Sequence, residues 1–152
     1  MQLSPSGRIV FVAQWVLALI LPMFVFLGRG LLGAQLGWTA VIGAGYGAII
    51  TLLLIVPPIL ALIDPVARAA RSVRGRYAFA TVMIWTGAIV AGLSIPDSDD
   101  EGFLDSAVSA WFGMPYEVSI VIFGVASGVA MVAWVAAVVF AVQGIRAGRR
   151  GE

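Results

Sequence analysis

The chain has 152 residues, of which 61% are hydrophobic and 11% charged, and its formal net charge is +1. So little polar material cannot cover a water-facing surface, which excludes a soluble globular protein and offers no basic face to nucleic acid. There is no His, Cys or Lys, so thiol chemistry, Fe–S clusters, most zinc sites and Schiff-base cofactors are excluded, and we expect neither a cofactor nor enzymatic activity.

Four apolar stretches without a charged residue follow one another along the chain, at residues 9–28, 39–63, 77–95 and 118–142. A hydrocarbon core about 30 Å thick requires roughly 20 helical residues, so each stretch can cross a membrane once. The alternating polarity of barrel strands is absent. The sequence therefore predicts an all-α integral membrane protein, an antiparallel four-helix transmembrane bundle that forms a single domain over residues 1–152.

A few polar side chains lie deep in these stretches. They are Gln14, Tyr46, Thr51, Trp85 and Trp134. A buried amide or indole N–H needs a hydrogen-bond partner in hydrocarbon, so we expect Gln14 to face the bundle and to bond to Trp134 or Thr51. We favour hydrogen bonds between helices as the role of these residues. The alternative is a small pocket for a lipid, quinone or apolar metabolite, framed by Gln14, Tyr46, Trp85 and Trp134.

The loop at residues 29–38 is short and glycine-rich, which predicts a hairpin of the first two spans. Two small-residue motifs follow, Gly43-x-x-x-Gly47 in the second span and Gly124-x-x-x-Gly128 in the fourth. Because lipid provides no hydrophobic drive for helix association, such motifs indicate close backbone packing. We interpret both as packing within the bundle, with homodimerisation through the fourth span as the alternative.

Pro57 and Pro58 interrupt the second span. Proline lacks a backbone N–H, so the carbonyls of Leu53 and Leu54 lose their usual helical partners and a kink is expected. We expect a neighbouring group to satisfy these carbonyls. The alternative is that the broken helix coordinates a solute, as in carriers.

Asp64-Pro65 has the pattern of an N-cap followed by proline at the first helical position, which predicts a short helix to about residue 73. The loop around it carries four arginines, Arg68, Arg71, Arg74 and Arg76. In a four-span protein these four arginines and those of the two tails lie on one side of the membrane, and only Arg29 lies on the other. This distribution predicts that both termini are cytoplasmic. We interpret the cluster as a topology signal at the lipid headgroups. Docking to anionic lipid or to an acidic partner is the alternative.

The loop between the third and fourth spans is acidic and contains an amphipathic segment. Ser98 and Glu101 have capping-box spacing, and apolar residues from Phe103 to Phe112 recur at helical intervals. We predict a helix over about residues 99–112 that lies on the outer membrane surface. It is interpreted as an interfacial anchor, with a lid or docking element as the alternative. Trp38, Trp111 and Tyr116 are assigned to the outer aromatic belt and Tyr77 to the inner one.

The absence of lysine beside nine arginines, with abundant Ala, Gly and Val, suggests a GC-rich bacterial genome and hence the bacterial cytoplasmic membrane. The sequence predicts a non-enzymatic membrane protein that acts through helix packing, either as an accessory subunit of a membrane-protein partner or as a homo-oligomer, in contact with membrane lipids. The alternative function is a carrier or channel for a small neutral or apolar solute, built around Pro57-Pro58.

Overall fold

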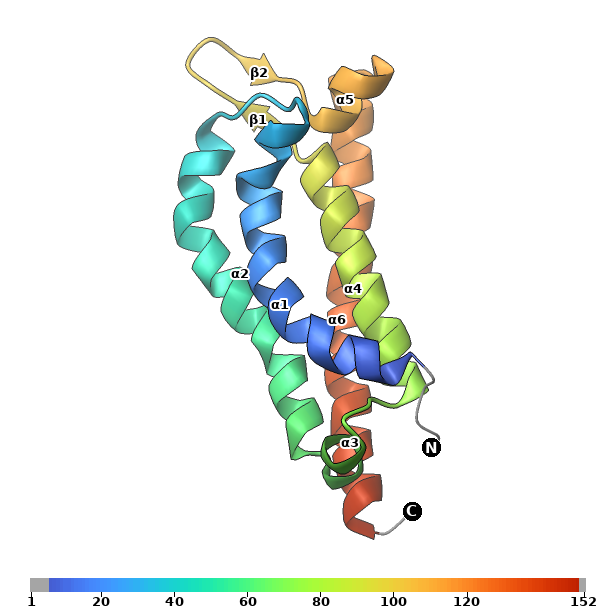
Figure 1. Cartoon of the computed structure of the whole chain (residues 1–152). Coiled ribbons are helices and arrows are strands. Elements are labelled where there is room, and N and C mark those ends of the chain that lie inside the picture. Colours follow the sequence, from blue (N-terminus) through green and yellow to red (C-terminus); the bar gives the residue numbers. More distant parts are fainter. Residues whose placement is uncertain (1–5, 151–152) are drawn as a thin grey trace.

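Four long helices run side by side and contain most of the chain (Figure 1). A computed structural model describes residues 6–150, apart from the side chain of Ala44, so the outermost residues of the predicted domain lie outside the described residues. The helices are α1 (Gly7–Phe26), α2 (Trp38–Ile63), α4 (Gly75–Ser94) and α6 (Tyr116–Arg150). All four are long and apolar enough to cross a membrane, as the four apolar stretches of the sequence predict.

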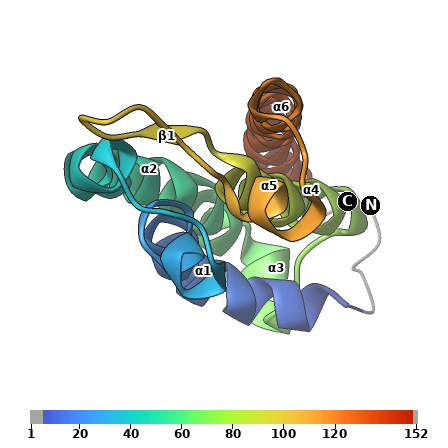
Figure 2. The same cartoon turned by 90° about the horizontal axis from the view of Figure 1, so that it is seen from above.

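Successive long helices run in opposite directions, and α4 is the most enclosed of them (Figures 1 and 2). It packs against α6 and α1. In its most apolar stretch 50% of the residues are buried, against 17% in α2 and 22% in α6. The core consists mainly of alanine with a few larger side chains, including Val10, Tyr77 and Ile84. Small side chains at these positions allow the helices to approach closely.

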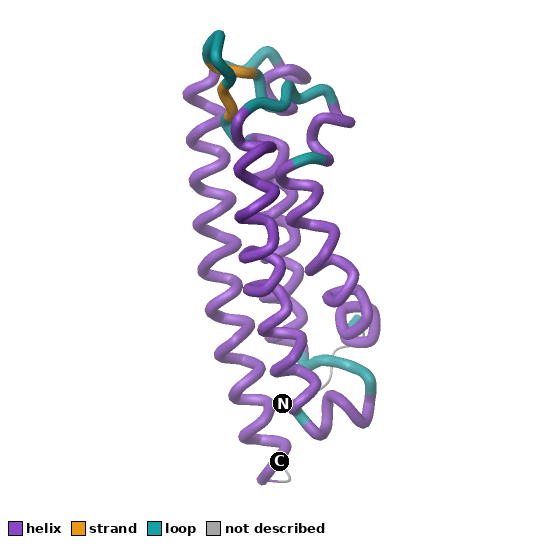
Figure 3. Tube along the Cα trace, turned by 90° about the vertical axis from the view of Figure 1, so that its left-hand side faces the viewer, coloured by secondary structure: helices purple, strands orange, loops and turns teal. Residues whose placement is uncertain are grey.

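The connecting segments gather at the two ends of the helices (Figure 3). One end, here called the hairpin end, holds the short 3₁₀ helix η1 (Gly28–Leu32), strands β1 (Asp97–Ser98) and β2 (Phe103–Leu104), and helix α5 (Ala107–Phe112). The other, here called the α3 end, holds helix α3 (Pro65–Ala70) and both ends of the described chain (Figure 1).

The predicted helix over residues 99–112 is wrong in its first half. Asp97 pairs with Leu104 and Ser98 with Phe103 in an antiparallel hairpin, and only Ala107–Phe112 is helical. The side chain of Asp99 accepts hydrogen bonds from the N–H groups of Glu101 and Gly102, and Gly102 has a positive φ of 145°, so these residues form a tight turn. The N-cap of α5 is therefore Ser106, whose hydroxyl accepts from the N–H of Ser109.

The short helix predicted after Asp64 is present as α3. The Asp64 side chain accepts hydrogen bonds from the N–H groups of Val66 and Ala67, and Pro65 occupies the first turn. The helix ends three residues earlier than predicted, because Arg71 takes the left-handed conformation at φ 48° and closes it.

Candidate functional site

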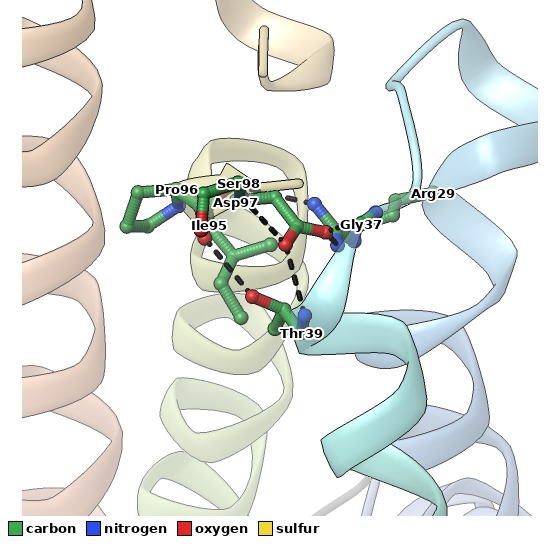
Figure 4. A network of polar contacts seen from close by, with 7 residues as sticks. All are labelled: Arg29, Gly37, Thr39, Ile95, Pro96, Asp97 and Ser98. Atoms are coloured by element: carbon green, nitrogen blue, oxygen red, sulfur yellow. Dashed lines mark hydrogen bonds and ion pairs between the residues drawn. The ribbon is translucent and has the colours of Figure 1, made fainter. Parts of the chain in front are cut away.

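The hairpin end is closed by a buried ion pair between Arg29 of η1 and Asp97 of β1 (Figure 4). The Arg29 side chain is fully buried, and its Nη2 donates to Asp97 Oδ2. The same carboxylate accepts from the N–H groups of Gly37 at 2.8 Å, Thr39 at 2.9 Å and Ser98 at 2.8 Å. One carboxylate thus joins η1, the start of α2 and β1. We call these residues, Arg29, Gly37, Thr39, Asp97 and Ser98, the clasp.

Asp97 lies outside the long helices, and its environment favours the ionised form. Burial by itself raises the pKa of the Asp97 carboxyl, but the backbone hydrogen bonds from Thr39, Gly37 and Ser98 outweigh burial and lower the pKa to about 2. The carboxylate is therefore ionised at neutral pH and neutralises the only arginine at this end. The pair is not predicted from the sequence, although a lone arginine facing an acidic loop is the pattern that could have revealed it.

A second buried ion pair closes the α3 end. Nε of Arg74 donates to Oδ2 of Asp64 at 3.0 Å, and Nη2 donates to the carbonyl of Gly144 at 3.4 Å. Asp64 therefore caps α3 while it binds the residue that immediately precedes α4. A Cβ at Gly144 would lie 2.7 Å from Oδ2 of Asp64, so glycine there allows α6 to approach the pair.

Arg74 therefore does not belong with the arginines assigned to the lipid headgroups, because its side chain is only 5% exposed and is held by Asp64. Arg68, Arg71 and Arg76 are exposed, as that assignment requires. In the sequence, the only sign that one arginine of this cluster is paired is Asp64, the single acidic residue beside it.

Gln14 faces the interior, and it is 2% exposed. Its partner is neither Trp134 nor Thr51. The hydroxyl of Tyr77 donates to Oε1 of Gln14 at 2.7 Å, and Nε2 of Gln14 donates to the carbonyl of Phe11 at 3.1 Å. Tyr77 is therefore an interior residue, 3% exposed, and its assignment to the inner aromatic belt is wrong.

One of the two carbonyls freed by the proline pair of α2 is satisfied by a neighbouring helix. Trp134 of α6 donates its indole N–H to the carbonyl of Leu53 at 2.8 Å. Leu53 is four residues before Pro57, so this carbonyl is one of the two that proline leaves without a helical partner. The contact joins α2 to α6 at the interruption, as the structural interpretation of these prolines requires.

The five polar residues proposed for a pocket do not come together. Tyr46 is 59% exposed on the outer side of α2. Gln14 and Trp85 share a space with Pro57 and Pro58 of only about 10 Å³, which is the lower limit for one water molecule. Thr51 lines a separate cavity of about 210 Å³ between α1 and α2. This arrangement removes the geometric basis for a solute pocket framed by Gln14, Tyr46, Trp85 and Trp134.

The two glycine motifs have different surroundings. A Cβ at Gly43 would overlap the ring of Phe26 in α1, and one at Gly47 would touch the same ring. By contrast, a Cβ at Gly124 or Gly128 would have no heavy atom within 4 Å. The interpretation of Gly124 and Gly128 as packing within the bundle is therefore wrong. The α6 helix contacts α4 through other small residues, since Gly87 lies against Ala126 and Ala130.

The described residues offer little for catalysis. Within residues 6–150, no three His, Cys, Asp or Glu side chains are placed so that they could hold a metal ion. Both buried carboxylates are already engaged by arginine. Comparison of the chain with known protein families, with curated proteins and with solved structures finds no match. Any conclusion on function therefore rests on the contacts described above.

Proposed function

We propose that the chain is an integral protein of a bacterial cytoplasmic membrane, with its four long helices crossing the bilayer as an antiparallel bundle and the α3 end in the cytoplasm. The distribution of exposed arginines supports this orientation. Of nine arginines, two are buried in ion pairs, and the other seven are exposed and belong to the α3 end. The only arginine of the hairpin end is neutralised by Asp97, so the hairpin end exposes no positive side chain. The hairpin and α5 then lie at the outer interface, where Trp38 and Trp111 are half exposed.

Its proposed role is non-enzymatic: it acts by packing α6 against a helix of a second copy or of another membrane protein. The observation that carries this proposal is the empty surroundings of Gly124 and Gly128. Glycine within a helix costs about 1 kcal/mol relative to alanine, and in membranes it is favoured where two backbones approach closely. Within residues 6–150 no other element approaches these two glycines, which supports a helix of another molecule as their partner.

Native mass spectrometry of the protein extracted gently from its own membrane tests this role. A mass at a multiple of 15.9 kDa supports self-association, and a mass that includes a second protein supports an accessory subunit. A chain that remains monomeric and alone at every detergent concentration that keeps it folded contradicts the proposal.

The alternative function, a carrier or channel, retains one supporting observation, the cavity of about 210 Å³ that reaches Thr51. The chain contains no cysteine, so Thr51→Cys introduces a single thiol. Labelling of this thiol in intact membranes by a charged, membrane-impermeant reagent would favour a hydrated pathway. Protection of the thiol, with labelling restored in denaturant, would contradict the carrier.

A further inference from the structure

A long apolar groove runs between α4 and α6 on the surface of the helices. Its larger part has a volume of about 570 Å³ and is lined by Phe79, Ala80 and Met83 of α4 and by Val132, Ala136 and Phe140 of α6, among others. A second part of about 330 Å³ continues it toward the hairpin end, and the two parts share Met83, Val125 and Val129. The groove therefore follows the two helices through most of the apolar region.

The larger part is long enough to hold a lipid acyl chain. Its α6 residues extend from Val125 to Phe140, which corresponds to about 22 Å of helix at 1.5 Å per residue. One leaflet of the hydrocarbon core is about 15 Å thick. The walls are almost entirely hydrocarbon, so a chain that enters from the α3 end can lie along the groove without leaving a polar group unsatisfied.

The mouth of the groove at the α3 end is positively charged. Arg76 is exposed and lies three, four and seven residues before Phe79, Ala80 and Met83, so it continues the same face of α4. On α6, the exposed amide of Gln143 follows Phe140 by one turn. Neither helix has an acidic residue near this mouth, because α4 has none and the single one of α6 is Glu117, at the hairpin end.

We propose that this groove is a binding site for one anionic phospholipid, with an acyl chain between Met83 and Ala136 and its phosphate on Arg76 and Gln143. A guanidinium binds a phosphate through charge-assisted hydrogen bonds. A zwitterionic headgroup also has a phosphate, but its choline cation cancels the net charge and is repelled by Arg76. Gly124 does not line the groove but Gly128 does, so this site overlaps in part with the face proposed for self-association.

Native mass spectrometry of the detergent-purified full chain measures this binding. The probes are phosphatidylglycerol and phosphatidylcholine with identical acyl chains, each added alone. We expect one phosphatidylglycerol to be retained per chain, with an affinity about tenfold higher than that of phosphatidylcholine. Equal retention of the two lipids overturns the proposal, as does an oligomer that retains neither, since a second copy then occupies the groove.

Two substitutions separate the headgroup contact from general attraction to a basic surface. Arg76→Gln should lower the retention of phosphatidylglycerol about tenfold, to the level of phosphatidylcholine. Arg149→Gln is the matched control, because Arg149 is nine residues beyond Phe140 and so on the opposite side of α6. This control should retain phosphatidylglycerol as the wild type does. An equal loss in both variants overturns the site at Arg76.

A third substitution tests the acyl-chain part. Ala136→Trp fills the groove and should abolish the retention of both lipids while the protein keeps the wild-type circular dichroism. If that variant does not fold, Val132→Trp replaces it, since Val132 lines the same groove and is 72% exposed. Lipid retention that survives a folded groove-filling variant contradicts the proposal.

Discussion

The second and fourth long helices contain the same motif, two glycines four residues apart, in opposite situations. In α2, Gly43 and Gly47 hold the ring of Phe26 from α1, so the motif is used within the chain. In α6, Gly124 and Gly128 are exposed, and within residues 6–150 no other element comes within 4 Å of a Cβ added at either position. The motif alone therefore does not say whether its partner lies in the same molecule, and for α6 we propose a partner in another one.

The clasp explains why the α2 motif finds its partner inside the chain. Asp97 binds Arg29, which follows α1, and it also binds Gly37 and Thr39 at the start of α2. This arrangement holds α1 beside α2 at the hairpin end and brings Phe26 onto Gly43. No comparable contact covers the outward face of α6 within the described residues.

The largest expected effect comes from opening the clasp. Asp97→Asn leaves the buried guanidinium of Arg29 without a counter-charge, which should lower the free energy of unfolding by about 3–5 kcal/mol. Thermal unfolding in detergent, followed by circular dichroism, measures the loss. Asp100→Asn is the matched control, since Asp100 is exposed and accepts only the indole N–H of Trp38. Equal midpoints for the Asp97 variant and the wild type would contradict this role of the clasp.

Acid should weaken the same contact in part. The pKa of Asp97 in the folded protein is about 2, below its ordinary value of 3.8, so the ionised carboxylate stabilises the fold above pH 4. That contribution is lost as the pH falls from about 4 toward 2. The midpoint of the wild type should fall over this range by more than that of Asp97→Asn. Parallel pH profiles of the two proteins would show that Asp97 is not the group responsible.

Filling the inward motif should have a moderate effect. Gly43→Leu places a side chain where the Phe26 ring lies, and overpacking of this kind costs about 1–3 kcal/mol. Adding Phe26→Ala should restore part of the loss, because it removes the overlapping ring. The midpoints of the single and double variants measure this rescue. A double variant no more stable than Gly43→Leu alone would argue against the Phe26 contact.

A smaller effect is expected where α6 faces α2. Trp134→Phe leaves the Leu53 carbonyl without its donor, which should cost about 0.6–1.7 kcal/mol, as other hydrogen bonds between membrane helices do. Trp85→Phe is a suitable control, since the Trp85 indole makes no hydrogen bond within residues 6–150. A similar loss in both variants would mean that aromatic packing, rather than the hydrogen bond, joins the two helices.

The long helices, the Asp64 cap and the inward direction of Gln14 could be predicted from the sequence, because each depends on residues close together in the chain. Arg29 and Asp97 are 68 residues apart, and Gln14 and Tyr77 are 63 apart. Such partners become visible only when the helices are placed side by side. The outer loop was misassigned because Asp99 and Gly102 stabilise a turn at the point where capping-box spacing indicated a helix.

Which face of α6 points toward the core could not be predicted, for a related reason. Its alanines and its glycines form adjacent stripes of small residues, and both suit close packing. The alanine stripe is the one that faces the core, through Ala126, Ala133 and Ala137. Periodicity shows that two stripes exist, but it does not say which one α4 covers.

The most direct test of the outward motif compares Gly124→Leu with Gly45→Leu. Both glycines lie in long apolar helices, and within residues 6–150 a Cβ added at either would have no heavy atom within 4 Å apart from the backbone of its own helix. Neither change should therefore destabilise the isolated chain. Association in detergent, measured by native mass spectrometry over a range of protein concentrations, should weaken at least tenfold in Gly124→Leu and remain unchanged in Gly45→Leu. Wild-type association in the Gly124 variant, or an equal loss in both, would contradict the proposal that α6 packs through this face.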